Sequence, residues 1–373
     1  MKHRKHLMIF ILLLLSSMIV TAQKELDSIL TGSTALLFDK PDQAITLAND
    51  ILEKSSDPTT KVKALTFMSS AYLSKRQNSK SLKSTLRSLE FLDQIDNPRI
   101  HIEVLNALGM QHQQLRMYDK AKDYLDRSLV LTNGLEPSDK PFSLLAYNYT
   151  IRGFIYREQM NCEIAQNYFD RALFQFNNLE KSTAVTANLS TVYYNKGNCF
   201  LQTTQIDSAR TSFEKSIAYA KKAHAPSLLA FAKKGLSEVY TAEGSYLLSV
   251  QHLYEADSIA SEVGDLVLLR GIYNNLANNF LALGNRKQYE FYDNRYQKTQ
   301  QELLAQERLL IDESLRNSRI DIISDRDEKL KNLHLTLLII LFVGGFLLLF
   351  LVRMTLKSRK QFLGAKKELN SPL

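Results

Sequence analysis

The sequence predicts an all-α protein, built as a solenoid of about six to seven stacked helical hairpins that is followed by a long linker helix and one transmembrane helix. Two observations support this fold class. A pattern of small and aromatic residues recurs along residues 23–297 at intervals of 37 to 44 residues, and no strand-like alternation competes with it. Residues 335–352 then form an apolar run of eighteen residues without a charge.

Residues 1–22 have the composition of a signal peptide. Lys2, Arg4 and Lys5 form a basic start, an apolar segment follows, and Ala22 is a small residue at the expected cleavage point. We expect the mature chain to begin at Gln23, with an uncleaved anchor as the alternative. No cysteine stands at the cleavage point, which argues against a lipoprotein.

Repeat units start near residues 62, 102, 146, 190, 230 and 270, with a partial unit near residue 25. Small residues dominate positions eight, twenty and twenty-seven of the unit, and an aromatic ring is usual at position eleven. Position eight is Ser69, Gly109, Gly153, Gly197, Ser237 and Ala277. Position eleven is Tyr72, His112, Tyr156, Phe200, Tyr240 and Phe280. Position twenty is Ser81, Ala121, Ala165, Ala209, Ser249 and finally Tyr289. Position twenty-seven is Ser88, Ser128, Ala172, Ser216, Ala256 and finally Tyr296.

We interpret each unit as a first helix, a short turn and an antiparallel second helix. Small side chains at positions eight and twenty let the two helices approach closely, and the ring at position eleven fills the space beside them. Position twenty-seven receives the next unit. Because a single hairpin cannot bury this surface, the units must stack. Turn signals such as Asn161, Gly244 and Gly284 fall between the predicted helices.

These units resemble the tetratricopeptide repeat, most clearly from Leu108 to Leu129 and from Gly153 to Leu173. The resemblance covers about three-quarters of the chain and implies a superhelix with an inner surface that binds peptides or proteins. The intervals exceed the ~34-residue consensus, so we expect longer helices or linkers. The consensus tryptophan is also replaced, by Leu105, Tyr149 and Tyr193.

Residues 298–333 are predicted to continue the second helix of the last unit as a charged linker, because no proline or glycine interrupts them. Leu304 and Ile311 keep a seven-residue interval, as do Leu315 and Ile322, but polar residues occupy the core positions between them. A dimeric coiled coil and a single helix both fit this weak heptad pattern.

Residues 334–353 are predicted to cross the membrane as one helix. At ~1.5 Å per residue, the apolar run covers roughly 27 Å, close to the ~30 Å hydrocarbon core. A buried core helix is the alternative, but core runs are usually shorter. Basic residues at Arg353 and in the tail 354–373 indicate a cytoplasmic tail, with the repeats exported to the periplasm and the chain held in the inner membrane.

The net charge of +8 comes from the two ends of the chain. The first residues contribute +3, and the segment from Arg353 contributes six basic residues against Glu368. The region between is neutral, so the positive charge reflects membrane topology and does not predict direct nucleic-acid binding.

Only two cysteines occur, Cys162 and Cys199, which excludes a disulfide scaffold. They fall in neighbouring units and could meet. Buried free thiols are commoner in helical packing of this kind, so we expect free thiols and leave a disulfide as the alternative.

No catalytic pattern is present. The histidines are scattered, and no metal-ligand, thiol-redox, nucleophile-elbow or phosphate-loop motif occurs. The sequence therefore predicts no enzyme, no cofactor and no metal site.

The predicted binding site is the inner surface, formed by the first helix of each unit. Amides recur there, and an amide offers both a donor and an acceptor to a peptide backbone. Asn is a poor helix former, by up to ~0.7 kcal/mol relative to Ala, so its recurrence favours a ligand over a merely solvated face. The candidate groove residues are Asn106, Gln113, Tyr147, Arg157, Tyr194, Asn195, Asn198, Lys234, Asn274, Asn275 and Asn278.

The family's carboxylate clamp is only partly present. Asn198 and Asn275 match its Asn positions, but the set of Lys and Arg partners is incomplete. Recognition of a C-terminal carboxylate is therefore not implied.

Two functions fit these features. The first is a membrane-anchored periplasmic receptor or scaffold that binds protein or peptide and forms a homodimer if the linker and span pair. The second is the truncated input half of a membrane-bound transcription regulator or signalling protein. The order of array, linker and span resembles the sensor half of bacterial membrane-anchored regulators of the same repeat family, without their effector domain.

Overall fold

The computed structural model describes residues 26, 28–30, 32–33, 36–136, 141–305, 308 and 353–354. Its repeat helices belong to one compact unit, Met1–Glu307. The predicted signal peptide, most of the linker and nearly all of the predicted span lie outside the described residues and stay predictions. Within the described part, no helix is both long enough and apolar enough to cross a bilayer.

All regular structure in the described residues is α-helical. After α2 (Leu36–Asp39) and α3 (Pro41–Lys54), first and second helices alternate. The first helices are α4 (Pro58–Ser74), α6 (Pro98–Gln114), α8 (Phe142–Glu158), α10 (Thr183–Gln202), α12 (Pro226–Ala242) and α14 (Leu266–Ala282). The second helices are α5 (Asn78–Leu92), α7 (Tyr118–Asn133), α9 (Cys162–Asn177), α11 (Ile206–Lys222), α13 (Tyr246–Val263) and a helix over residues 286–305.

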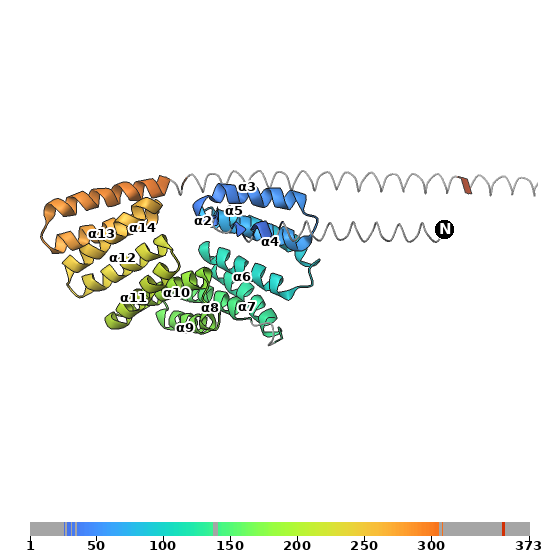
Figure 1. Ribbon diagram of the computed structural model, residues 1–373, viewed down its shortest axis with the longest axis horizontal. Coiled ribbons are helices and arrows are strands. Elements are labelled where there is room, and N and C mark those ends of the chain that lie inside the picture. Colours follow the sequence, from blue (N-terminus) through green and yellow to red (C-terminus); the bar gives the residue numbers. More distant parts are fainter. Residues whose placement is uncertain are drawn as a thin grey trace, which may run out of the picture. The chain divides into compact units, whose positions relative to one another are not determined.

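The hairpins stack in sequence order, as the blue-to-orange ribbon of Figure 1 shows. Each of the second helices α5, α7, α9, α11 and α13 packs against the first helix of its own unit and against the first helix of the next unit. Neighbouring first helices also contact one another, from α4 and α6 through to α12 and α14. The described chain therefore contains six hairpins, with α3 packed on α4 as the second helix of a partial unit.

The predicted register is confirmed by burial. Position twenty is fully buried in the first five units, and so is position twenty-seven. In the last unit these positions are Tyr289 and Tyr296, which are only half-buried. No further hairpin in the described residues covers them, so a large side chain fits where a small one is needed inside the stack.

In three units the ring at position eleven stacks on a ring twelve positions later, in the second helix of the same unit. Tyr156 and Tyr168 lie parallel with ring centroids 5.4 Å apart. Tyr240 with His252, and Phe280 with Tyr292, repeat this arrangement. The ring at position eleven therefore joins the two helices of a hairpin.

A second recurrent contact was not predicted from the sequence. The guanidinium of Arg171 lies 4.2 Å from the ring centroid of Tyr149, and Arg295 lies 4.2 Å from Tyr273, again across twenty-two residues. Two units lie between them: in the first, the ammonium of Lys215 lies 5.3 Å from the ring centroid of Tyr193, and in the second, Lys233 and Glu255 take the same two positions and form an ion pair. The cation over a ring and the ion pair each hold the first helix of a unit against its second helix. The shared interval of twenty-two residues is the signal that reveals it.

The hairpin turns also follow one pattern. The fifteenth residue of every unit has a left-handed backbone: Arg76, Arg116, Met160, Thr204, Gly244 and Gly284. This conformation ends the first helix and starts the reversal into the second. Several first helices begin at a side-chain cap, such as Asp57 on the Thr60 amide and Asp265 on those of Val267 and Leu268.

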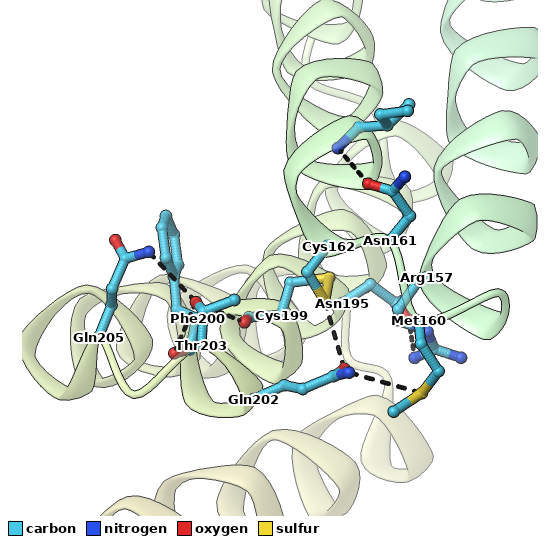
Figure 2. The surroundings of a disulfide bond; sticks show 11 residues. Arg157, Met160, Asn161, Cys162, Asn195, Cys199, Phe200, Gln202, Thr203 and Gln205 are labelled. Carbon is cyan, nitrogen blue, oxygen red and sulfur yellow. Dashed lines mark hydrogen bonds between the residues drawn. A yellow bond between two sulfur atoms is a disulfide. The ribbon is translucent and has the colours of Figure 1, made fainter.

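The expectation of free thiols is wrong, because Cys162 and Cys199 form a disulfide (Figure 2). Their Cα atoms lie 5.1 Å apart, within the usual range for such a bond. Cys162 is the first residue of α9 and Cys199 lies in the last turns of α10, so the bond joins consecutive units. The sequence places the two residues in neighbouring units, but not on facing sides of these helices.

One contact joins distant parts of the array. The guanidinium of Arg76, in the turn between α4 and α5, donates to both carboxylate oxygens of Asp265 at 2.9 and 3.1 Å. Asp265 is at the same time the cap of α14. The turn between the two helices of the first complete unit therefore contacts the N-terminus of α14, the first helix of the last unit.

Candidate functional site

The surface formed by the contacting first helices α6, α8, α10, α12 and α14, here called the inner face, carries the predicted groove residues. Three of these are buried and act inside the protein. Asn106 donates to the carbonyl of Leu144 and accepts from Ser128 and Asn148. This amide joins α6, α7 and α8 and does not face a ligand, which corrects its assignment to the groove.

Gln113 and Asn195 are also buried, and each bridges neighbouring first helices. Gln113 on α6 donates to Glu158 on α8 at 2.9 Å. Asn195 on α10 accepts from Arg157 on α8 (Figure 2). It also donates to the carbonyl of Thr191. The recurrence of amides on these helices therefore has a structural cause as well, because the bonds fix one unit on the next.

Further along the inner face, Asn275 on α14 donates to Glu238 on α12 at 2.9 Å. The same carboxylate pairs with Lys234, one turn before it on α12. Burial is the largest single influence on the pKa of Lys234 and lowers it. The negative charge of Glu238 and its hydrogen bond raise the pKa, and the raising effects together exceed the effect of burial. The net shift is upward, so Lys234 stays charged and paired.

The side chain of Lys234 lies against the next first helix. A Cβ atom built on Gly271 of α14 would stand 2.8 Å from Cε of Lys234. Glycine at this position therefore leaves room for the Lys234 stem to lie flat against α14. The ammonium is held between Gly271 and Glu238, and its side chain is 18% exposed.

The remaining candidates are accessible. Asn274 and Asn278 are exposed on one side of α14, one turn apart, and Asn198 is half-buried on α10. None of these three amides makes a hydrogen bond to another described residue. Tyr147 on α8 is 43% exposed, and its hydroxyl accepts from Asn188 on α10.

Aromatic side chains complete the inner face. Tyr194 on α10 packs on Phe213 from α11 and on Phe231 from α12, with ring centroids 5.9 and 5.7 Å apart. Sequence reasoning identified Tyr194 but missed Phe231 and the two acids Glu158 and Glu238. Phe231 and Glu238 lie three and four residues from the predicted groove residue Lys234, on the same face of α12, and that spacing was the available signal; Glu158 directly follows Arg157 and has no such spacing.

The arrangement offers hydrogen bonds and apolar contact, and little else. Within the described residues, no group of His, Cys, Asp and Glu is placed to hold a metal ion. The inner face can hold an extended chain, because amides such as Asn274 and Asn278 both donate and accept, and the exposed ring of Tyr147 offers apolar surface.

The sequence matches no protein-family model and no curated protein. Solved structures resemble the fold. NprR in complex with its cognate peptide NprX has a TM-score of 0.54 at 12% identity, over 80% of this chain and 87% of that one. The apo form of RapI has a TM-score of 0.52 at 13% identity, over 76% of each chain. Rap protein complexed with Competence and Sporulation Factor has a TM-score of 0.50 at 14% identity, over 76% of this chain and 99% of that one.

These structures share the stacked hairpins, and the buried small residues at positions eight, twenty and twenty-seven supply the repeat register. The chain has the tetratricopeptide-repeat fold. In this tetratricopeptide-repeat array, helix pairs α4–α5 to α12–α13 are full internal units, and α14 with residues 286–305 ends the described stack.

Proposed function

We propose that this chain is a membrane-anchored periplasmic receptor or scaffold that binds a peptide or a flexible protein segment and has no catalytic activity. The observation that carries the proposal is the set of unbonded amides on the inner face, Asn198, Asn274 and Asn278, together with the exposed ring of Tyr147 on the same face. Two of the similar folds, NprR and the Rap protein, were solved with a bound peptide or factor, which supports the peptide as the ligand class.

The membrane anchor and export are part of the proposal and rest on sequence. The apolar run 335–352, the basic tail and the signal-peptide composition of residues 1–22 agree on one orientation. The disulfide between Cys162 and Cys199 supports export as well, because such bonds persist in oxidising compartments.

The second candidate is the input half of a membrane-bound transcription regulator or signalling protein. Its support is the helix over residues 286–305, which ends the array and is predicted to continue into a linker. A segment leading from the ligand-binding array towards the membrane suits signal transfer. A scaffold needs no such connection.

Binding is tested by replacing Asn198, Asn274 and Asn278 together with alanine. Each lost amide contact removes about 1 kcal/mol of binding free energy, or about fivefold in affinity, so partner recovery from a periplasmic extract should fall steeply. Asn167→Ala is the matched control, because Asn167 is exposed on the second helix α9. Unchanged partner recovery with the triple variant would show that the partner binds another surface of the protein.

Topology is tested with intact spheroplasts. Added protease should digest the repeat array and leave the tail 354–373 undegraded, since the tail is predicted to be cytoplasmic. The readout is a blot with one antibody against the array and another against the tail. Protection of the array in sealed cells would contradict the proposed export.

A further inference from the structure

The charged side chains of the inner face carry information about the ligand beyond the amides. The first helices α8, α10, α12 and α14 contain few charged residues, and these fall into two groups by direction. Arg152, Lys196 and Lys233 pair with Asp126, Asp170 and Glu255 on the second helices α7, α9 and α13. These three pairs point away from the inner face.

Two pairs remain on the inner face itself. Arg157 lies 3.9 Å from Glu158 and donates to Asn195, while Glu158 also accepts from Gln113. Lys234 pairs with Glu238, which also accepts from Asn275. Arg270, the only charged residue of α14, donates to Gln300 in the helix over residues 286–305.

Arg157, Glu158, Lys234 and Glu238 therefore each have a partner of opposite charge on this face, and both pairs are partly buried, while Arg270 is directed to the neutral amide of Gln300. The side chains of Lys234 and Glu238 are 18% and 26% exposed, and those of Arg157 and Glu158 are 27% and 31% exposed. Separating a partly buried pair leaves an uncompensated charge, which is costly. A charged ligand side chain would meet both signs at once and gain little.

We infer that the inner face from α8 to α14 takes an extended peptide segment whose bound residues are uncharged, and that it holds this segment chiefly through the peptide backbone. The inference deepens the proposed peptide-binding function and rests on it. The groups free to make contacts are neutral: the amides Asn198, Asn274 and Asn278, the exposed ring of Tyr147 and Leu281, which is 59% exposed.

Backbone recognition suits this set of side chains. A peptide backbone presents one donor and one acceptor per residue, and each free amide can satisfy both. Tyr147 and Leu281 then accept uncharged or apolar side chains, which gain from leaving water. Because the four charges on this face are paired and Arg270 is directed to Gln300, binding should depend only weakly on ionic strength.

The test is a selection from displayed random-sequence peptides against the purified full-length chain, run in parallel against the triple variant Asn198→Ala/Asn274→Ala/Asn278→Ala. Peptides enriched on the wild type and lost on the variant are the groove-dependent set. We expect this set to be poorer in Lys, Arg, Asp and Glu than the unselected library. For individual peptides, the Kd should change by less than about threefold between about 0.05 and 0.5 M ionic strength.

The outcomes distinguish a failure of the preference for uncharged peptides from a failure of peptide binding itself. A groove-dependent set rich in one sign of charge, with affinity that falls about tenfold or more with salt, would overturn the inference and leave peptide binding intact. If no selected peptide is lost on the triple variant, the proposed groove itself fails. Circular dichroism of both proteins confirms that the variant keeps its helical fold.

Discussion

Reduction of the Cys162–Cys199 disulfide is expected to lower the free energy of unfolding by about 4 kcal/mol, the value that chain entropy gives for a loop of this length. The two cysteines are thirty-seven residues apart and close a loop over most of one repeat unit. The bond joins α9 to α10, so its loss weakens the contact between consecutive units, on which a repeat array depends. Urea unfolding followed by circular dichroism, with and without reductant, measures the change.

The double variant Cys162→Ala/Cys199→Ala is the control for this experiment. It should unfold near the midpoint of the reduced wild type and should not respond to reductant. In intact cells, both sulfurs should resist alkylation until reductant is added, because the array is proposed to be exported. Alkylation of both thiols without reductant, or a wild-type midpoint that reductant leaves unchanged, would contradict the bond.

The sequence was sufficient for the repeat register because helix contacts select residue size directly. A position such as Ala165 or Ala209 lies where two helices touch, and any larger side chain would separate them. The same size rule explains why Tyr289 and Tyr296 appear only in the last unit. The number of hairpins followed from these positions, whereas the first helices begin four to seven residues before the predicted unit starts.

The candidate site was less predictable, because the pattern assigns a residue to a helix face but not to a neighbour. Asn106 and Asn195 lie on the predicted helices, yet both are buried and bond to adjacent helices. Their partners depend on how far one unit is shifted along the next. The same shift brings Cys162 opposite Cys199, and no single-unit pattern records it.

Replacing Gly153 with leucine is expected to destabilise the array by about 3 kcal/mol or more, because the helix pair α8–α9 has no room for a side chain there. A Cβ atom on Gly153 would lie 2.3 Å from Cε1 of Phe169, a ring that is fully buried. Phe169 also packs against Phe154, with ring centroids 6.0 Å apart, so it cannot move aside freely. Thermal and urea unfolding of the full-length chain measure the loss.

The variant Gly153→Ala tests whether the destabilisation comes from the contact with Phe169. In an open helix, Gly→Ala stabilises by about 1 kcal/mol through helix propensity, so a net loss for Gly153→Ala must come from the clash with Phe169. Gly134→Ala, at the C-cap of α7, is a control without a clash, since a Cβ there would lie 3.4 Å from the nearest atom, the carbonyl oxygen of Leu131. Adding Phe169→Leu to Gly153→Ala should recover part of the loss by shortening the ring side chain. If Gly153→Leu unfolds like the wild type, the eighth position does not face the second helix and the repeat register is wrong.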